Sequence, residues 1–66
     1  MEYAEKSKAI RKETGWNQTY LGKLIGSTQS EISSIERGFI PLDLSRIEKI
    51  AKLYEVICEK KKRLYP

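Results

Sequence analysis

The hydrophobic positions between residues 17 and 38 fall at the three- and four-residue spacing of two short amphipathic helices. The first set consists of Leu21, Leu24 and Ile25. Asn17 precedes this set, and its side-chain oxygen can cap a helix by accepting a bond from an unpaired backbone N–H group. Gly26 follows the set, and glycine enters the left-handed conformation without a side-chain clash. We therefore predict a helix over residues 18–25 that ends in a sharp turn.

The second set of hydrophobic positions is narrower, because it contains only Ile32 and Ile35. Thr28 and Glu31 stand at the spacing of a capping box, in which each side chain bonds the backbone N–H group of the other residue. This spacing predicts a second helix over residues 29–36. Its remaining faces carry small uncharged side chains that form hydrogen bonds, namely Gln29, Ser30, Ser33 and Ser34. Such a helix contributes little to a core and presents polar groups to a partner.

Longer helices are expected on both sides of this pair. Residues 2–14 carry acids first and bases later, which suits the helix dipole, and Gly15 ends the segment. Asp43 can cap a further helix. The apolar positions of that helix are Leu44, Ile47, Ile50, Ala51, Tyr54 and Ile57. No glycine, proline or asparagine interrupts it before the last residue, so we expect it to continue toward Lys60 or to end in a loose basic tail at about residues 59–66.

Two short helices joined by a turn that contains glycine form the helix-turn-helix arrangement, whose second helix enters the major groove of DNA. The chain resembles the Cro/C1-type helix-turn-helix domain of phage repressors and the wider group of XRE-like regulators. The resemblance rests on residues 15–18, 26–30, 35–38 and 47–53, together with Leu21 and Ile32. It covers roughly residues 3–56. It implies an all-α, lambda-repressor-like bundle of four to five helices, which we expect to form a single domain over residues 1–66.

The resemblance also implies which side chains touch DNA. The implied base contacts are Thr28, Gln29, Ser30, Ser33 and Ser34. The implied phosphate contacts are Asn17, Gln18, Lys23 and Arg37. Gln29 is the main candidate for base recognition, because a side-chain amide can both donate to and accept from the edge of adenine. In phage repressors, a glutamine that matches Gln18 also braces the glutamine that matches Gln29.

The same resemblance implies a buried or half-buried ion pair between Arg11 and Glu36, against the alternative of two independent surface charges. Trp16 stands where the family usually has leucine, and we expect it in the core rather than stacked on a base. Tyr20 is expected on the outer face of its helix, either reaching a phosphate or simply exposed. Gly22 replaces the small residue, usually alanine, at which the two short helices cross, and it costs about 1 kcal/mol of helix propensity.

The loop at residues 39–42 is apolar for a connection between helices. One interpretation is that Ile40 and Leu42 pack under the last helix. The alternative is that Phe39 and Ile40 form a dimer contact together with the C-terminal helix, since members of the family usually pair through this side. A single domain of this size makes few contacts with DNA, so the resemblance implies a homodimer on a palindromic site.

Composition narrows the possible functions. A chain of 66 residues buries only about 60% of its extended surface, which leaves little room for an active site. Its 13 basic and 9 acidic residues give a net charge of +4, which modestly favours a polyanionic partner. Histidine is absent and Cys58 is the single cysteine, so the sequence predicts no disulfide, no zinc site and no cofactor. No acid–base pair, activated nucleophile or phosphate loop indicates an enzyme or a small-molecule substrate.

Cys58 and the basic tail each allow two interpretations. Cys58 is interpreted as a small packed residue near a helix end, and the other hypothesis is a redox-sensing thiol beside the basic run. The basic tail is interpreted as a solvated end, and the other hypothesis is electrostatic help for DNA binding. No apolar run approaches about 20 residues and no signal peptide is visible, so we expect no membrane association and a cytoplasmic location, in a bacterial cell or a phage-infected bacterium.

The sequence thus predicts a transcription regulator that binds double-stranded DNA in a sequence-specific manner. Repression by a dimer is the expected mode of action. The competing hypothesis is an antitoxin-like or partner-binding adaptor that keeps the fold without a DNA role, because fold does not fix function. The polar surface of the second short helix argues against the adaptor, because a protein interface usually needs large apolar anchors.

Overall fold

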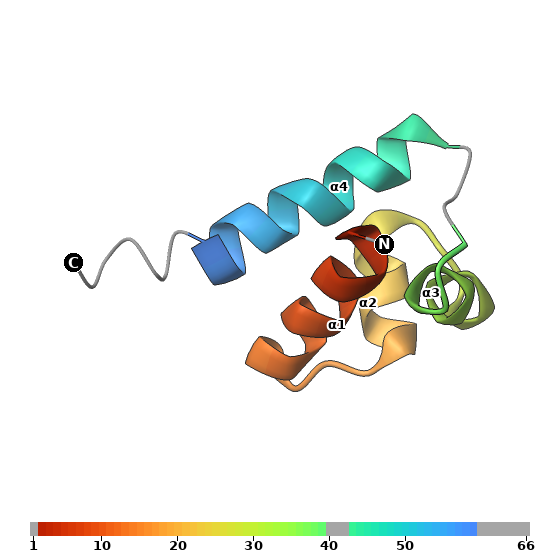
Figure 1. The fold of residues 1–66 in the computed structure, drawn as a ribbon. Coiled ribbons are helices and arrows are strands. Elements are labelled where there is room, and N and C mark those ends of the chain that lie inside the picture. The colour runs from red at the N-terminus through yellow and green to blue at the C-terminus, as the bar shows by residue number, and fades with distance from the viewer. Residues whose placement is uncertain (1, 40–42, 60–66) are drawn as a thin grey trace.

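The computed structural model describes residues 2–39 and 43–59, and most of these residues are helical. The elements are α1 (Glu2–Thr14), α2 (Gln18–Ile25), α3 (Gln29–Glu36), α4 (Leu44–Tyr54) and the π-helical segment η1 (Glu55–Glu59) (Figure 1). Within these ranges no strand is present, so the predicted all-α, lambda-repressor-like class is confirmed. The two short helices have the bounds expected from the sequence.

Local capping explains where the short helices begin and end. The Asn17 side chain accepts the Tyr20 backbone N–H at 2.8 Å, and Gly26 adopts a φ of 77° at the end of α2. Both bonds of the predicted capping box at Thr28 are formed. Asp43 accepts the Ser45 backbone N–H at 3.0 Å and so begins α4. These four boundaries are therefore determined by residues within one helical turn.

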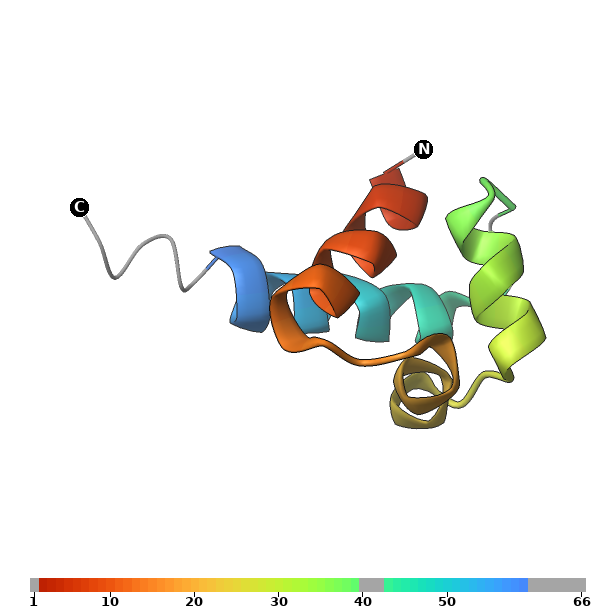
Figure 2. The same ribbon diagram turned by 90° about the horizontal axis from the view of Figure 1, so that it is seen from below.

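The core lies where α1, α2, α3 and α4 meet. Its buried side chains are Ile10, Leu21, Ile25, Ile32, Ile35 and Ile50. Partly buried residues surround this cluster, and Trp16 is one of them, with its ring edge-on to Tyr20 at a centroid distance of 5.1 Å. Trp16 thus packs as expected, while Tyr20 is exposed. Two views place α3 at one edge of the bundle, with no helix covering its outer side (Figures 1 and 2).

Two leucines of the hydrophobic pattern lie outside the core. Leu24 and Leu44 are 42% and 65% exposed, respectively. The buried residues of α2 are Leu21, Gly22 and Ile25. Leu24 lies on a different side of the helix from these residues. Leu44 is the first residue of α4 and contributes nothing to the central cluster. Periodicity therefore predicted both helices correctly but overestimated the width of their buried faces.

Gly22 is required by the tight turn between α2 and α3. The Ser27 backbone N–H donates to the Gly22 carbonyl at 2.7 Å, which brings the two backbones together. A Cβ atom at residue 22 would lie 2.5 Å from the Ser27 carbonyl oxygen, far inside van der Waals contact. Backbone cannot move aside as a flexible side chain can. The glycine therefore permits a closer approach than the alanine that is usual in the family.

Replacement of Gly22 by alanine should consequently destabilise the fold. Alanine is favoured by about 1 kcal/mol in a helix, but overpacking against rigid backbone costs about 1–3 kcal/mol, so we expect a net loss of about 1–2 kcal/mol. Urea unfolding measures the difference. Thr19→Ala, at an exposed position of the same helix, is the control and should be neutral or slightly stabilising. A Gly22→Ala protein that is more stable than wild type would show that the turn can open.

The C-terminal helix continues beyond α4, as expected from the uninterrupted pattern, but its last turn is π-helical. Cys58 lies in this turn with 7% of its surface exposed. Burial favours packing over redox sensing, because reactive thiols are at least partly accessible. Ile40, Leu42 and the basic tail beyond Glu59 lie outside the described residues.

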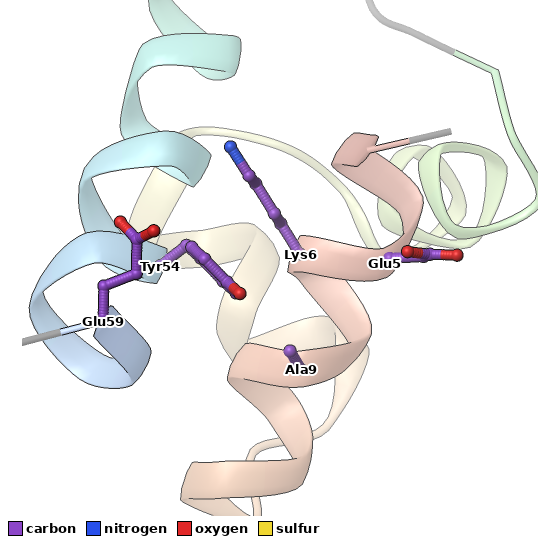
Figure 3. A pocket seen from close by; sticks show the side chains of 5 residues that line it. All are labelled: Glu5, Lys6, Ala9, Tyr54 and Glu59. Carbon is purple, nitrogen blue, oxygen red and sulfur yellow. The ribbon is translucent and has the colours of Figure 1, made fainter. Parts of the chain in front are cut away.

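Aromatic rings and a lysine join α1 to the end of α4. The Lys6 ammonium lies 5.6 Å from the centre of the Tyr3 ring and 5.4 Å from that of Tyr54. These are distances at which a cation is attracted to the face of an aromatic ring. An open pocket beside them is lined by Glu5, Lys6, Ala9, Tyr54 and Glu59 (Figure 3). No helix in the described ranges is sufficiently long and apolar to span a membrane.

Candidate nucleic-acid interface

The outer side of α3 is a continuous polar surface. It consists of Gln29, Ser30, Ser33, Ser34 and Arg37, which we call the polar arc. Gln29, Ser30 and Arg37 are exposed, and the two serines between them are half-buried. Successive helix residues are rotated by about 100°, so these positions share one side while Ile32 and Ile35 point into the core. The arc thus combines a side-chain amide, three hydroxyl groups and one guanidinium, and it contains no carboxylate.

Both acidic residues of α3 face other helices instead of the arc. Glu31 accepts a bond from Arg46 of α4 at 3.0 Å. Glu36 is buried against α1 and α2, and its main partner is Arg11. Each carboxylate is therefore neutralised by an arginine from a neighbouring helix. A polyanion that approaches the polar arc meets Arg37 without facing an unpaired negative charge.

Glu36 is the point at which the three N-terminal helices are joined. Arg11 of α1 donates two bonds to its carboxylate, from Nε and from Nη2, each 2.9 Å long. Ser7, which is fully buried in α1, donates a third at 2.7 Å, and Gln18 of α2 donates a fourth at 3.1 Å. The carboxylate is thus bound by four donors on two helices. A planar guanidinium suits this two-pronged contact better than a lysine ammonium would.

This environment lowers the pKa of Glu36. Burial alone would raise the pKa, but it is outweighed by the hydrogen bonds from Arg11, Ser7 and Gln18 together with the positive charge of Arg11. The hydrogen bond between Arg11 and Glu36 also raises the pKa of Arg11. The pKa of Glu31 is lowered chiefly by the bond from the Thr28 backbone, with a further contribution from Arg46.

Glu36 should therefore make the fold acid-sensitive. Its pKa is lower in the folded than in the unfolded chain, where it is about 4.3, so its stabilising contribution is complete above that value and is lost as the pH falls through the folded value. We expect the free energy of unfolding, measured in urea, to fall between about pH 5 and pH 3. Glu36→Gln should be less stable at neutral pH and should show a shallower fall. If the free energy of unfolding fell equally with pH in wild type and in Glu36→Gln, Glu36 would not be a source of the acid sensitivity.

Gln18 connects this network to the polar arc. Its Nε2 atom donates to Glu36, and its Oε1 atom accepts a bond from Nε2 of Gln29. Gln18 is half-buried, whereas Gln29 is exposed. The first residue of the polar arc is thus linked by hydrogen bonds to a buried carboxylate at the other end of α3.

The N-terminus of α3 is fixed in two ways. The Thr28 hydroxyl accepts the Glu31 backbone N–H at 3.2 Å, and the Glu31 carboxylate accepts the Thr28 backbone N–H at 2.8 Å. Arg46 then binds the other oxygen of Glu31 and also lies 3.5 Å from the Asp43 carboxylate. The capping box therefore orients the helix locally, and Arg46 attaches it to α4.

A comparison with families of known proteins supports the interpretation of this surface. Residues 8–56 match the family model described as helix-turn-helix, of the XRE and Cro/C1 type. The chain belongs to the helix-turn-helix family. This family consists of DNA-binding regulatory domains that are not typically enzymes, so the chain is assigned to DNA-binding transcription regulation. Searches of curated proteins and of solved structures found no match to it.

Most of the expected contact residues of the helix-turn-helix pair are exposed, and the others are half-buried. Gln18 and Gln29 are in direct contact, and Thr28 is exposed at the start of α3. Lys23 is also exposed, on α2. Arg37 lies at the C-terminal end of α3. Its guanidinium is 3.5 Å from the Ser34 hydroxyl and 5.9 Å from the centre of the Phe39 ring.

Three contacts of the helix-turn-helix domain were not foreseen. They are the bonds from Ser7 and Gln18 to Glu36 and the bond from Arg46 to Glu31. The bond from Ser7 had one signal in the sequence, which is that Ser7 lies on the apolar side of residues 2–14. A buried hydroxyl group there needs a hydrogen-bond partner. The bond between Arg46 and Glu31 joins residues of two helices, and no spacing within one helix indicates it.

Proposed function

We propose that this protein is a sequence-specific regulator that reads double-stranded DNA by placing α3 in the major groove. The observation that carries the proposal is the polar arc, whose five residues face outward while both carboxylates of the helix bind arginines elsewhere. In this role Gln29 is the main base contact, and Thr28, Ser30, Ser33 and Ser34 are the further ones. Hydroxyl groups can donate and accept, so the serines discriminate less between bases.

Phosphate contacts would flank the arc. The α2 helix begins at Gln18. The first backbone N–H groups of a helix have no carbonyl partner within it, and the helix dipole favours an anion there. Asn17 and Gln18 are therefore proposed to hold one phosphate, with Lys23 and Arg37 binding others. These contacts position the protein and supply affinity that depends on salt but carries no sequence information.

We further propose that the protein acts as a homodimer on a palindromic operator and that it represses transcription. Phe39 and Leu44 are 64% and 65% exposed on either side of the loop, and Val56 near the end of the C-terminal helix is 47% exposed. These apolar side chains support a dimer contact through Phe39, Ile40 and the C-terminal helix. Two α3 helices about 34 Å apart would then enter successive major grooves.

Selection of bound sequences from a pool of random duplexes tests this proposal. We expect enrichment of a short palindrome and an affinity for it that falls linearly with salt concentration on logarithmic scales. Enrichment of a single half-site would contradict the dimer while leaving base recognition intact. Failure to bind any duplex, even at low salt, would contradict the proposed function and favour the adaptor hypothesis.

A further inference from the structure

Arg46 lies between the two carboxylates that cap α3 and α4. Its Nη1 atom donates to Oε2 of Glu31 at 3.0 Å, and its Nε atom lies 3.5 Å from Oδ2 of Asp43. The other oxygen of each carboxylate accepts a backbone N–H group at the start of its own helix, from Thr28 for α3 and from Ser45 for α4. One guanidinium thus bridges the beginnings of the two helices, while both carboxylates keep their capping bonds.

Glu31 is the carboxylate of α3 that would come nearest to DNA. It lies in the first turn of the helix, directly after Ser30, and its side chain is 43% exposed, whereas that of Glu36 is 6% exposed. The N-terminal residues of a recognition helix are those that contact base edges in the groove. An unpaired carboxylate at this position would repel the phosphates on either side of the groove, because charges in about 0.1 M salt act over about 10 Å.

We propose that Arg46 is a positioning residue for DNA binding. It holds the Glu31 carboxylate in an ion pair, so the first turn of α3 keeps its cap without presenting an unpaired negative charge to the phosphates. The inference rests on the proposed function, because it assumes that α3 enters the major groove. Arg46 differs from Lys23 and Arg37 in this respect, since it acts through Glu31 and not through a phosphate contact of its own.

The net charge of the pair formed by Arg46 and Glu31 predicts the order of affinities in four proteins. The pair is neutral in wild type, negative in Arg46→Met, positive in Glu31→Gln and neutral again in the double variant. Arg46→Met should bind a duplex selected by wild type about three- to tenfold more weakly, as expected for one charge about 10 Å from a phosphate in a partly solvated site. Glu31→Gln should bind more tightly than wild type, and its amide can still accept the Thr28 N–H group because glutamine also forms capping boxes. The double variant should bind within about twofold of wild type, because its pair is again neutral.

Titration of the four proteins into the selected fluorescent duplex in low salt measures these affinities. Lys49→Met is the matched control, because it removes one positive charge from an exposed position of α4 that forms no ion pair within residues 2–39 and 43–59. It should change the affinity by less than about twofold, because its charge is not paired with a carboxylate of α3. Urea unfolding of each variant establishes that it is folded.

Rescue of Arg46→Met by Glu31→Gln is the decisive result. A direct phosphate contact of Arg46, or a purely structural link between α3 and α4, would be missing from the double variant as well, so a double variant as weak as Arg46→Met would overturn the proposal. A folded Arg46→Met protein that binds as wild type does would also overturn it. If Arg46→Met does not fold, Glu31→Gln decides, and an affinity no higher than that of wild type would overturn the proposal. All these outcomes leave the proposed function intact, whereas wild-type protein that binds no duplex would overturn both.

Discussion

Replacement of Arg11 by methionine should reduce the free energy of unfolding by about 3–5 kcal/mol. The substitution keeps an apolar stem of similar length but removes both bonds that Arg11 donates to Glu36. The Glu36 side chain is only 6% exposed, so its carboxylate would remain buried with two neutral donors and no positive charge. This loss is a large part of the roughly 5–15 kcal/mol by which folded domains are stable. Urea unfolding at neutral pH measures it.

Lys12→Met is the control for this prediction, because it removes a positive charge from an exposed position on the same turn of α1. Surface substitutions of this kind usually change stability by less than about 0.5 kcal/mol. Arg11→Lys should lie between the two, because it keeps the charge but loses the planar fork. Equal stabilities of the Arg11→Met and Lys12→Met proteins would show that Arg11 and Glu36 act as independent surface charges.

Replacement of Gln29 by alanine should weaken binding to the selected operator by about 10- to 100-fold for each half-site, which corresponds to one lost bidentate base contact. Binding to unrelated duplexes should change little, because Lys23, Arg37 and the start of α2 are untouched. The salt dependence should also remain. Titration of wild-type and variant protein into fluorescent duplexes, one selected and one of scrambled sequence, measures both affinities.

Ser45→Ala provides the comparison, since it removes an exposed hydroxyl group from α4 and lies outside the polar arc. It should bind both duplexes as wild type does. If Gln29→Ala retained the full preference for the selected sequence, Gln29 would be removed from base recognition and the serines of the arc would have to supply it.

The structure depends on local signals to different degrees. Asn17, Gly26, Thr28 and Asp43 fix helix ends through contacts within a few residues, and the bounds of α2 and α3 could therefore be predicted from the sequence. The outward direction of Gln29 and Ser30 follows from the narrow apolar stripe of α3 for the same reason. Both features depend on spacing along one helix.

Contacts between helices could not be obtained in this way. The pattern could not show that α2 buries Gly22 and leaves Leu24 exposed, because this depends on how closely the following turn approaches. Nor could it show that Arg46 holds Glu31, since the crossing of α3 and α4 brings the two residues together. The pair of Arg11 and Glu36 was expected from the family resemblance alone. Neither the charges nor the residue spacing within α1 or α3 predicts that Arg11 and Glu36 form an ion pair.

The distribution of charge on α3 connects stability with recognition. A helix that carries Glu31 and Glu36 would repel phosphates if either carboxylate faced outward. Arg46 and Arg11 instead hold these carboxylates against neighbouring helices, and the same contacts fix both ends of α3. The same two ion pairs therefore stabilise α3 and pair both of its carboxylates with arginines, so that neither belongs to the polar arc.

The most direct test of the account is a titration of isotopically labelled wild-type protein with its selected duplex, followed by amide NMR signals in low salt. We predict the largest shifts at residues 28–37 and at residues 17 and 18, including the side-chain amides of Gln18 and Gln29. Signals of the central core, such as those of Ile10 and Ile50, should move little. Shifts concentrated on α1 or on the pocket beside Tyr54, with the polar arc unaffected, would contradict the claim that α3 is the surface that reads DNA.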